Sequence, residues 1–507
     1  MSYLLGIDIG TSGAKVLAID ESGAVAASES AEYPLLTPRP QWAEQNAEDW
    51  WSATIECTKK VLEKIPAEQI SGIGLSGQMH GLVMLDAQGK VMRPAILWCD
   101  QRTQSQCDTI TETVGQELLV SETCNPVLTG FTAPKIIWVR ENEPHLYERA
   151  TMFLLPKDYI RFMLTGEFAT EVSDASGTSL LNVPERRWSD AVLGKLQIGK
   201  DKLPRVYESY EVSGQISKAG AAATGLKEGT PVVGGGGDQA AGAVGNGIVQ
   251  SGIISVATGT SGVVFAFSDK PVLDPQLRVH TFCHAVPNKW HIMGVMLSAG
   301  GSLRWYRDTL GISEKAVAQM MSVDPYEIIA RAAQTIAPGS EGLMFLPYLT
   351  GERTPHPDPS ARGAFVGLTV RHNKAHLARA VLEGVAFGLR DSLEIMKEMN
   401  ISIGNVRSSG GGARSALWRQ IQADVFNYPL STINVDEGPA LGAAILAGVG
   451  AKLYSSVEEA CSTVVKVVGS TSVVAENAEI YARYYEVYRG LYPALKDSFA
   501  ALTELDV

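Results

Sequence analysis

Near the middle of the chain, four consecutive glycines lead into an aspartate, in the stretch Pro231-Val232-Val233-Gly234-Gly235-Gly236-Gly237-Asp238-Gln239-Ala240-Ala241-Gly242-Ala243. Its β-branched residues Val232 and Val233 predict a short strand. The four glycines that follow carry no Cβ, so backbone or a ligand can approach them closely. A carboxylate, Asp238, comes next. We expect an aspartate held at a strand end and facing a cleft; the alternative is a flexible glycine loop with an ordinary turn aspartate.

The size and charge of the chain restrict its class. At 507 residues it exceeds one hydrophobic core, so two or more domains are expected. Its 45% apolar and 19% charged residues are typical of a globular protein in water. A net charge of −12 argues against nucleic acid or an anionic membrane as the main partner. It permits a small anionic ligand, because backbone amides can bind one locally.

The sequence also bears on location. No run of 18 apolar residues is present, so no transmembrane helix is predicted. No basic segment with a cleavage site opens the chain, so no signal peptide is predicted. The scattered cysteines form no CxxC, which favours a reducing, cytoplasmic location over a disulfide framework or a zinc site; they are Cys57, Cys99, Cys107, Cys124, Cys283 and Cys461.

The N-terminus predicts a hairpin that carries a carboxylate. Residues 4–9 form an apolar strand containing Asp8, the turn Gly10-Thr11-Ser12-Gly13 follows, and residues 14–20 predict a second strand. A dinucleotide site would need a helix directly after the glycines. This turn instead offers amides and hydroxyls to a phosphate. A buried Asp8 is costly unless paired or near a metal; the alternative is a carboxylate bonded to its own turn.

The same pattern returns about half the chain later. Residues 253–265 again give an apolar strand, the turn Gly259-Thr260-Ser261-Gly262 and a second apolar strand, with Ala257 where the first copy has Asp8. A match in the same setting at half-length predicts a duplicated domain. Two phosphate-holding turns and one metal-holding carboxylate suit a single cleft between two related domains.

Polar clusters follow two further predicted strands. Residues 70–76 lead into Gly77-Gln78-Met79-His80-Gly81, where the alternative is a core histidine bonded to the backbone. Residues 95–103 end in a cluster containing Asp100 and Arg102, which could instead be a surface pair of no consequence. Residues 170–178 predict a polar loop that either lines a sugar cleft or is simply a loop.

Three segments of the second half bear on a nucleotide. Residues 297–305 form a small-residue turn leading into a helix, and Trp305 could lie over a purine or just pack. The glycine run in 408–415 opens a helix, which favours a nucleotide over a flexible turn. Residues 437–444 predict a small-residue helix that packs closely against a sheet.

Capping and periodicity predict several helices. Asn46 is expected as an N-cap and Pro134 as a first helical position, the latter opening a helix with one apolar face. A helix is expected over 378–396, with Val381, Val385, Leu389 and Leu393 on one face, and a closing helix after Glu476.

Two longer motifs join these stretches: Gly130 to Asn142 with Lys135 and Trp138, and Gly363 to Leu368 continuing through His376-Leu377 to Ala380–Glu383. With them, nearly the whole chain resembles the FGGY carbohydrate kinases of the actin-like ATPase superfamily. The resemblance implies an α/β fold of two actin-like ATPase (ribonuclease H-like) domains, each a mixed sheet flanked by helices, with the active-site cleft between them. It implies a sugar-binding and catalytic domain over 1–245 and a nucleotide-binding domain over 246–507.

Within the family, the chain most resembles the members that phosphorylate xylulose. The motifs that carry this likeness are Ser76–Gly81, Leu97–Asp100, Leu154–Tyr159 and Gly351–His356.

The resemblance implies a role for each matching residue. Asp238 matches the general base, and Asp8 matches the carboxylate near Mg²⁺. The sugar-binding set is Met79, His80, Asp100 and Gln239. The set for ATP is Gly10, Thr11, Ser12, Gly13, Gly259, Thr260, Ser261, Gly300, Trp305, Gly411, Gly412 and Ala413. Cys99, Gln239 and Ala416 depart from an asparagine found in relatives; the first two bear on the sugar and the third on nucleotide contacts.

The predicted reaction is ATP-dependent phosphorylation of D-xylulose to D-xylulose 5-phosphate with Mg²⁺. The enzyme is expected to be cytoplasmic and to bind neither nucleic acid nor membrane. A homodimer is a possible assembly. One alternative is a family member acting on ribulose, fuculose, gluconate or glycerol. Another is a nucleotide switch of the actin or Hsp70 type. No helix-turn-helix segment precedes Leu4, against a sugar-sensing repressor, and no Gly-x-x-x-x-Gly-Lys-Ser/Thr pattern occurs, against a Walker-type kinase.

Overall fold

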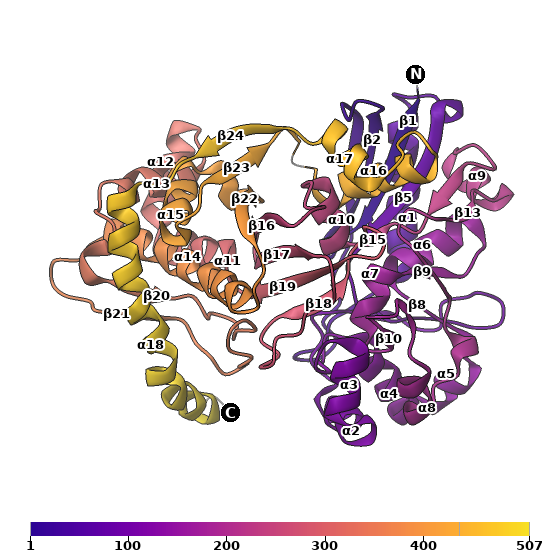
Figure 1. The fold of residues 1–507 in the computed structure, drawn as a ribbon, viewed down its shortest axis with the longest axis horizontal. Coiled ribbons are helices and arrows are strands. Elements are labelled where there is room, and N and C mark those ends of the chain that lie inside the picture. Colours follow the sequence, from indigo (N-terminus) through magenta and orange to yellow (C-terminus); the bar gives the residue numbers. More distant parts are fainter. Residues whose placement is uncertain (1, 436, 506–507) are drawn as a thin grey trace.

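The computed structural model describes residues 2–435 and 437–505. Its framework is a pair of mixed sheets, which Figure 1 places on the two sides of the molecule. The first sheet has the order β13-β14-β5-β1-β2-β3, with β15 also paired to β5. Its strands are β1 (Tyr3–Ile9), β2 (Gly13–Asp20), β3 (Val25–Glu32), β5 (Ile70–Gly77), β13 (Val212–Gln215), β14 (Pro231–Val233) and β15 (Gly236–Gly237).

The second sheet has the order β18-β19-β17-β16-β22-β23-β24. Its strands are β16 (Gly252–Thr258), β17 (Gly262–Ser268), β18 (His280–Cys283), β19 (Trp290–Met296), β22 (Ile403–Ser409), β23 (Leu430–Ile433) and β24 (Val467–Thr471). Small two-stranded sheets pair β4 (Glu44–Gln45) with β7 (Ala95–Ile96), β6 (Val83–Leu85) with β8 (Met152–Leu154), β9 (Ala169–Glu171) with β12 (Arg205–Tyr207), β10 (Leu181–Asn182) with β11 (Arg187–Trp188), and β20 (Met344–Leu346) with β21 (Ala364–Val366).

The two large sheets repeat one arrangement, as the duplicated turn predicts. In the first, β1 is antiparallel to β2 and parallel to β5. In the second, β16 is antiparallel to β17 and parallel to β22. Each Gly-Thr-Ser-Gly turn joins the two antiparallel strands, so both turns are hairpins. The expected two-domain α/β fold with mixed sheets flanked by helices is confirmed.

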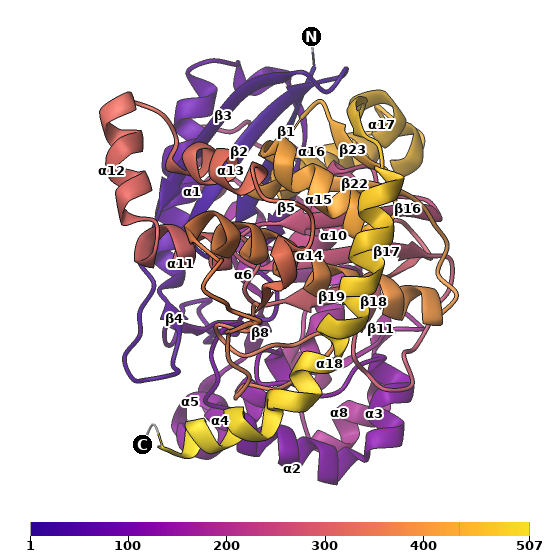
Figure 2. The ribbon, with the colours of Figure 1, turned by 90° about the vertical axis from the view of Figure 1, so that its left-hand side faces the viewer.

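Helices cover the sheets, and α18 closes the second half along its outer side (Figure 2). The helices of the first half are α1 (Ala47–Leu62), α2 (Gln104–Val114), α3 (Gln116–Thr123), α4 (Thr132–Asn142), α5 (Pro144–Arg149), α6 (Pro156–Thr165), α7 (Val172–Ala175), α8 (Asp190–Leu196), α9 (Lys218–Thr224) and α10 (Asp238–Gly245). Those of the second half are α11 (Gly300–Thr309), α12 (Ile312–Met321), α13 (Pro325–Gln334), α14 (Lys374–Glu398), α15 (Ala416–Phe426), α16 (Gly438–Gly450), α17 (Val457–Val464) and α18 (Ala475–Leu505).

The junction between the halves is made by α10 and α16, which lie between the sheets in Figure 1. Although α16 belongs to the second half of the sequence, it packs on β1 and β5 of the first sheet. A Cβ on Gly6 or Gly74 would lie 1.9 Å from a carbonyl oxygen of α16, and one on Gly442 would lie 1.7 Å from that of Ala241 in α10. Small residues therefore allow helix and strand backbones to touch here. The close packing expected of residues 437–444 is confirmed, against the sheet of the other half.

Local expectations at helix starts were partly wrong. Asn46 does occupy the N-cap position of α1, but its side chain makes no capping hydrogen bond. Helix α4 begins at Thr132, so Pro134 lies inside the first turn, and residues 132–139 are buried all round rather than on one face. The apolar strand expected at the start of residues 95–103, before the polar cluster, is only the two residues of β7.

The segment 170–178 is not a loop. It forms the end of β9, the single turn α7 and a 3₁₀ turn over Ser176–Thr178, and all of it is buried. The side chain of Glu171 accepts hydrogen bonds from the amides of Ser173 and Asp174. Its polar residues are bonded within the protein, which explains how a polar sequence can be buried.

Two bulk predictions also have structural counterparts. The six cysteines are all free thiols. Among the described residues, no helix combines the length and apolar content needed to cross a bilayer.

Candidate active site

Two carboxylates meet at one edge of the first sheet. On β1, Asp8 lies opposite Ser76 of β5, and Ser76 lies opposite Gly236 of β15. Asp238 follows β15 directly and begins α10. Because neighbouring strands are separated by about 4.8 Å, the backbones at Asp8 and Gly236 are about 10 Å apart across the sheet, and Asp238 comes two residues after Gly236.

The glycine run before Asp238 is a fixed feature and not a flexible loop. Gly235 has φ of +74°, a conformation that favours glycine. A Cβ there would lie 1.9 Å from the carbonyl oxygen of Leu75. Gly236 and Gly237 then pair with Ser76 and Gly77 of β5. The missing side chains let the run cross close to β5 and fix the position from which Asp238 starts.

Burial sets the charge state of both carboxylates. It raises the pKa of Asp8 from 3.8 to about 6. The pKa of Asp238 is raised from 3.8 to about 7, first by burial and then by the negative charge of Asp8. The Oδ1 atom of Asp8 is buried without a hydrogen-bond partner. An aspartate that titrates near neutrality suits a general base, and an unsatisfied carboxylate oxygen suits a cation ligand.

The ring of His80 is held in one tautomer. Its Nδ1 lies 2.7 Å from the carbonyl oxygen of Gly177, which can only accept, so Nδ1 donates and Nε2 keeps a lone pair. Burial, followed by the nearby charge of Lys135, lowers the pKa of His80 well below 6.5, so the ring stays neutral. His80 is thus prepared to accept a hydrogen bond from a hydroxyl at Nε2.

The packing around His80 ties it to the catalytic edge. Its ring stacks on Phe131 at 4.7 Å, with Phe282 of β18 at 6.3 Å. Met79 packs against both Gly177 and Gly237, where a Cβ would lie within 3.2 Å of its side chain. The predicted sugar-binding pair, Met79 and His80, therefore lies beside the residue that precedes Asp238, and the second half of the chain contributes to its surroundings.

Asp100 is used differently from expectation. Its oxygens accept hydrogen bonds from the amide of Ala43 at 2.7 Å and from the guanidinium of Arg102 at 2.6–3.0 Å. Both side chains of the pair are buried, so it is not a surface pair either. Both oxygens of Asp100 are thus engaged within the protein and support the loop, and its contact with the sugar stays a prediction. Gln239 is partly exposed next to Asp238.

A cavity of about 770 Å³ lies in the second half. It is lined by Gly259 and Thr260 of the second turn, by Gly300 of α11 and by Gly411 and Gly412 before α15. Apolar and aromatic side chains, among them Tyr326, Leu303, Leu382 and Trp418, also line it, together with charged residues such as Arg304 and Asp324. A lining that combines glycines with apolar side chains fits a nucleotide, because the phosphates need close backbone approach and the base needs apolar walls. Ala416, where relatives have asparagine, also lines this cavity.

Of the residues predicted for ATP, Ser261, Trp305, Ala413 and the whole first turn Gly10–Gly13 are not part of the cavity lining. Trp305 stacks on Phe345 at 6.0 Å, so its contacts are those of a packed residue. Ala413 accepts a hydrogen bond from Arg419 at its carbonyl and donates its amide to Gly410. Gly411 and Gly412, by contrast, are at the wall.

The two predicted phosphate turns have different surroundings. In the first, the Thr11 hydroxyl accepts from the indole of Trp98 at 3.0 Å, the amide of Gly10 bonds to Gly13, and Ser12 is exposed. In the second, the Thr260 hydroxyl accepts from Arg304 at 3.0 Å, and the amides of Gly300 and Gly301 donate to the turn. Thr260 is exposed and Ser261 partly so.

Arg353 was missed as a candidate from sequence. It comes from the second half, yet its Nη2 lies 4.0 Å from where a Cβ on Gly130 would be, and its charge lowers the pKa of His80 after burial and Lys135. Among the described residues, no carboxylate lies within ion-pair distance of its guanidinium. Arg353 lies inside the motif Gly351–His356, which indicated only the family. Its approach to His80 joins residues far apart in the sequence, so no local pattern predicted it.

The protein side chains at this site could bind Mg²⁺ only together with the phosphates of the nucleotide. No cluster of three or more His, Cys, Asp or Glu side chains that could hold a metal is found in the part of the chain that the structure describes. Asp8 has the right chemistry, since its Oδ1 is unsatisfied. Mg²⁺ is commonly held by one or two carboxylates with substrate phosphates and water, which is what Asp8 could supply.

The duplicated fold thus holds a near-neutral carboxylate close to a hydroxyl-accepting histidine in its first half and a glycine-lined cavity in its second half. Comparison with known proteins shows the family to which a chain with these features belongs. Residues 3–245 match the N-terminal domain of the FGGY family of carbohydrate kinases, and residues 254–451 match its C-terminal domain. The chain belongs to the FGGY family of carbohydrate kinases.

Relatives of this FGGY kinase match it over most of its length. The xylulose kinase of Bacillus subtilis is 40% identical and covers 99% of both chains. The xylulose kinase of Escherichia coli is 43% identical over 90% of this chain and 91% of its own. The structure of a ligand-bound xylulose kinase from Lactobacillus acidophilus superposes with a TM-score of 0.92 at 28% identity, covering 99% of this chain and 100% of that one.

Proposed function

We propose that this FGGY kinase transfers the γ-phosphoryl group of ATP to a hydroxyl of D-xylulose, giving D-xylulose 5-phosphate and ADP. The observation that carries the proposal is the position of Asp238, whose pKa is raised to about 7, at the same sheet edge as Asp8 and beside the residues that hold His80. The choice of D-xylulose is supported by relatives named xylulose kinase at 40% and 43% identity.

In the proposed step, Asp238 acts as the general base. The sugar hydroxyl oxygen forms a bond to the γ-phosphorus while the bond between that phosphorus and the β,γ-bridging oxygen breaks, and the hydroxyl proton passes to the Asp238 carboxylate. A base with a pKa near the working pH is well matched to this transfer. His80 would orient the sugar by accepting a hydroxyl hydrogen bond at Nε2, with Met79 and Gln239 beside it.

The nucleotide would occupy the cavity of the second half. Gly259, Thr260, Gly300, Gly411 and Gly412 are among its lining residues. We assign the triphosphate to these residues and to the two Gly-Thr-Ser-Gly turns. Asp8 would hold Mg²⁺, which neutralises phosphate charge when bound.

In this proposal the two halves of the chain have different roles. Residues 1–245 carry the sugar-binding and catalytic groups, and residues 246–507 carry the nucleotide cavity. Because Phe282 and Arg353 of the second half reach the surroundings of His80, the sugar site would be completed only when both halves are in place. The cytoplasmic location and a homodimer stay predictions.

The test is a coupled assay of ADP formation with Mg-ATP and a panel of D-xylulose, ribulose, fuculose, gluconate and glycerol. D-xylulose should give the highest kcat/KM, with a product phosphorylated at its terminal hydroxyl. A higher kcat/KM for another member of the panel would replace the proposed substrate. ATP turnover that ignores every sugar would instead support a nucleotide switch.

A further inference from the structure

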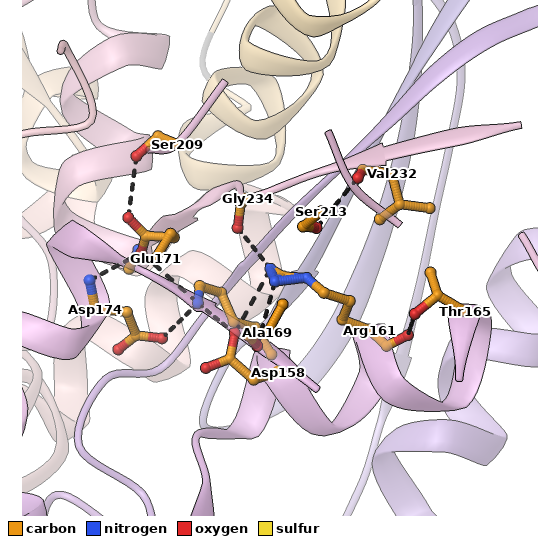
Figure 3. A network of polar contacts seen from close by, with 12 residues as sticks. Asp158, Arg161, Thr165, Ala169, Glu171, Asp174, Ser209, Ser213, Val232 and Gly234 are labelled. Carbon is orange, nitrogen blue, oxygen red and sulfur yellow. Dashed lines mark hydrogen bonds and ion pairs between the residues drawn. The ribbon is translucent and has the colours of Figure 1, made fainter. Parts of the chain in front are cut away.

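A buried polar cluster lies directly behind the glycine run. It comprises Lys157, Asp158 and Arg161 of α6, Glu171 of β9 and Asp174 of α7, all fully inaccessible to water. Figure 3 shows Asp158, Arg161, Glu171 and Asp174 of this cluster close to one another and to Gly234. The Nζ atom of Lys157 lies 2.7 Å from Asp158, 3.1 Å from Asp174 and 3.6 Å from Glu171. So many buried charges are costly, and a fold keeps them only if they are well paired.

The cluster is bonded to the backbone that leads to Asp238. Nη2 of Arg161 donates to the carbonyl of Gly234 at 2.5 Å, as Figure 3 shows. The amide of Gly237 donates to Oε1 of Glu171 at 3.2 Å and to Oγ of Ser173 at 3.1 Å. Both ends of the four-glycine run are therefore fixed by side chains that lie more than sixty residues earlier in the chain.

Glu171 is itself held rigidly. Its Oε1 also accepts from the Ser173 hydroxyl at 2.9 Å and the Asp174 amide at 2.8 Å. Its Oε2 accepts from the Ser173 amide at 2.7 Å and the Ser209 hydroxyl at 3.0 Å. A carboxylate surrounded by donors has one orientation, so it gives the Gly237 amide one direction.

The direction of that amide matters because glycine imposes no side-chain packing of its own. Gly237 immediately precedes Asp238, and rotation of the peptide before it would turn the Asp238 carboxylate relative to the sugar. A misplacement of about 1 Å in a reacting group can cost about 100-fold in rate.

We propose that Glu171 and Ser173 are positioning residues for Asp238: they hold the Gly237 amide so that the carboxylate meets the sugar hydroxyl. Arg161 holds the other end of the run through Gly234. This inference rests on the proposed function, because it assumes that Asp238 takes the hydroxyl proton.

The decisive variant is Ser173→Ala. It removes one of the two acceptors of the Gly237 amide but retains the backbone bond from residue 173 to Glu171. Glu171→Ala would remove one of the three carboxylates around Lys157 and the acceptor of several buried donors, so it is expected to unfold the protein and is unsuitable. Ser209→Ala is the matched control, because it removes a buried hydroxyl bonded to the same carboxylate at Oε2, the oxygen that does not touch Gly237.

Steady-state kinetics with D-xylulose and Mg-ATP should show kcat lowered by about 10- to 100-fold in Ser173→Ala, with calorimetric affinities for sugar and ATP within twofold of the wild type. Ser209→Ala removes one donor that steadies Glu171 at Oε2 but leaves both acceptors of the Gly237 amide, so kcat should fall by less than about threefold. Enzyme concentration is taken from the sugar-binding stoichiometry, so that a loss of folded protein does not count as a loss of rate.

A double-mutant cycle then separates positioning from general damage. In an Asp238→Asn background the base is absent, so adding Ser173→Ala should change the residual kcat by less than twofold. If the same 10- to 100-fold loss persists there, or if Ser173→Ala and Ser209→Ala lower kcat equally, the inference is wrong.

The failure of the proposed function would look different. A wild-type enzyme inactive on the whole sugar panel, or an Asp238→Asn variant with full kcat, would overturn the role of Asp238, and the positioning role with it. An active wild type, an impaired Asp238→Asn variant and an unimpaired Ser173→Ala variant would overturn the positioning role alone.

Discussion

Replacing the proposed base should stabilise the protein, and more so as pH rises. Burial raises the pKa of Asp238 from 3.8 to about 7, so the folded chain binds its proton more tightly than the unfolded chain does. The free energy of unfolding that this group contributes is fully present below pH 3.8 and is lost as pH rises through about 7. An asparagine side chain cannot ionise, so Asp238→Asn avoids that loss.

The size of the effect follows from the pKa change. Each pKa unit corresponds to about 1.36 kcal/mol, so the change from 3.8 to about 7 sets a ceiling of about 4 kcal/mol. The residue is partly exposed and some of the shift comes from Asp8, so about half of that ceiling is expected. For a cooperative unit of about 250 residues, 1 kcal/mol moves Tm by about 2 °C, which gives about 4 °C.

The assay is differential scanning calorimetry of the wild type and Asp238→Asn at pH 5 and pH 8, without substrate. About two of the roughly three pKa units between 3.8 and about 7 lie above pH 5, so Tm of the variant relative to the wild type should rise by about 3 °C between pH 5 and pH 8. Asp20→Asn is the control, because hydrogen bonds lower the pKa of Asp20, so its replacement should not raise Tm at pH 8. A pH-independent Tm difference for Asp238→Asn would refute the claim that a desolvated carboxylate stands at this position.

Three further predictions follow from the geometry. The kcat/KM for sugar should fall as pH drops below about 7, because only ionised Asp238 accepts the proton; a rate independent of pH from 5 to 8 would contradict this. Gly177→Ala should raise the KM for sugar at least tenfold and leave the KM for ATP within twofold, because a Cβ there would lie 2.3 Å from Nδ1 of His80; equal changes in both constants would argue against that contact. Gly442→Ala should lower the free energy of unfolding by about 1–3 kcal/mol, because the new Cβ would clash with α10. Gly490→Ala in α18, where the new Cβ meets open space, should raise the free energy of unfolding by about 0.5–1 kcal/mol. Denaturant unfolding that ranks the two variants the other way would refute the packing argument.

Local sequence predicted the parts of the fold that are formed locally. Apolar runs on either side of the two Gly-Thr-Ser-Gly turns predicted two hairpins, and the structure has both. The short strand before the glycine run, the helix over 378–396 and the closing helix were also found. In each case the signal and the structure lie within the same few residues.

What failed depends on contacts between distant residues. The segment 170–178 is polar, so it was expected to be a loop, yet it is buried and its partners include Gly237 and Ser209. Asp100 was assigned to the sugar through the family resemblance, which gave no sign that the amide of Ala43 and the buried side chain of Arg102 bind it. The approach of Arg353 to His80 likewise depends on how the halves meet, which no local pattern encodes.

Sequence predicted those parts of the candidate site whose residues are neighbours in one motif. The adjacency of Asp238 to the glycine run and of His80 to Met79 could be seen in sequence, but the register that puts Asp8 and Asp238 at one edge required the pairing of β1, β5 and β15. The roles of these residues in binding and catalysis stay predictions.

The most direct test of the account is the kcat of Asp238→Asn for D-xylulose at pH 8, measured beside calorimetric binding of the sugar. The account predicts that kcat falls at least about 100-fold while the Kd for sugar stays within threefold, because the base is lost and the binding groups remain. A kcat within tenfold of the wild type would show that the proton of the sugar hydroxyl goes elsewhere.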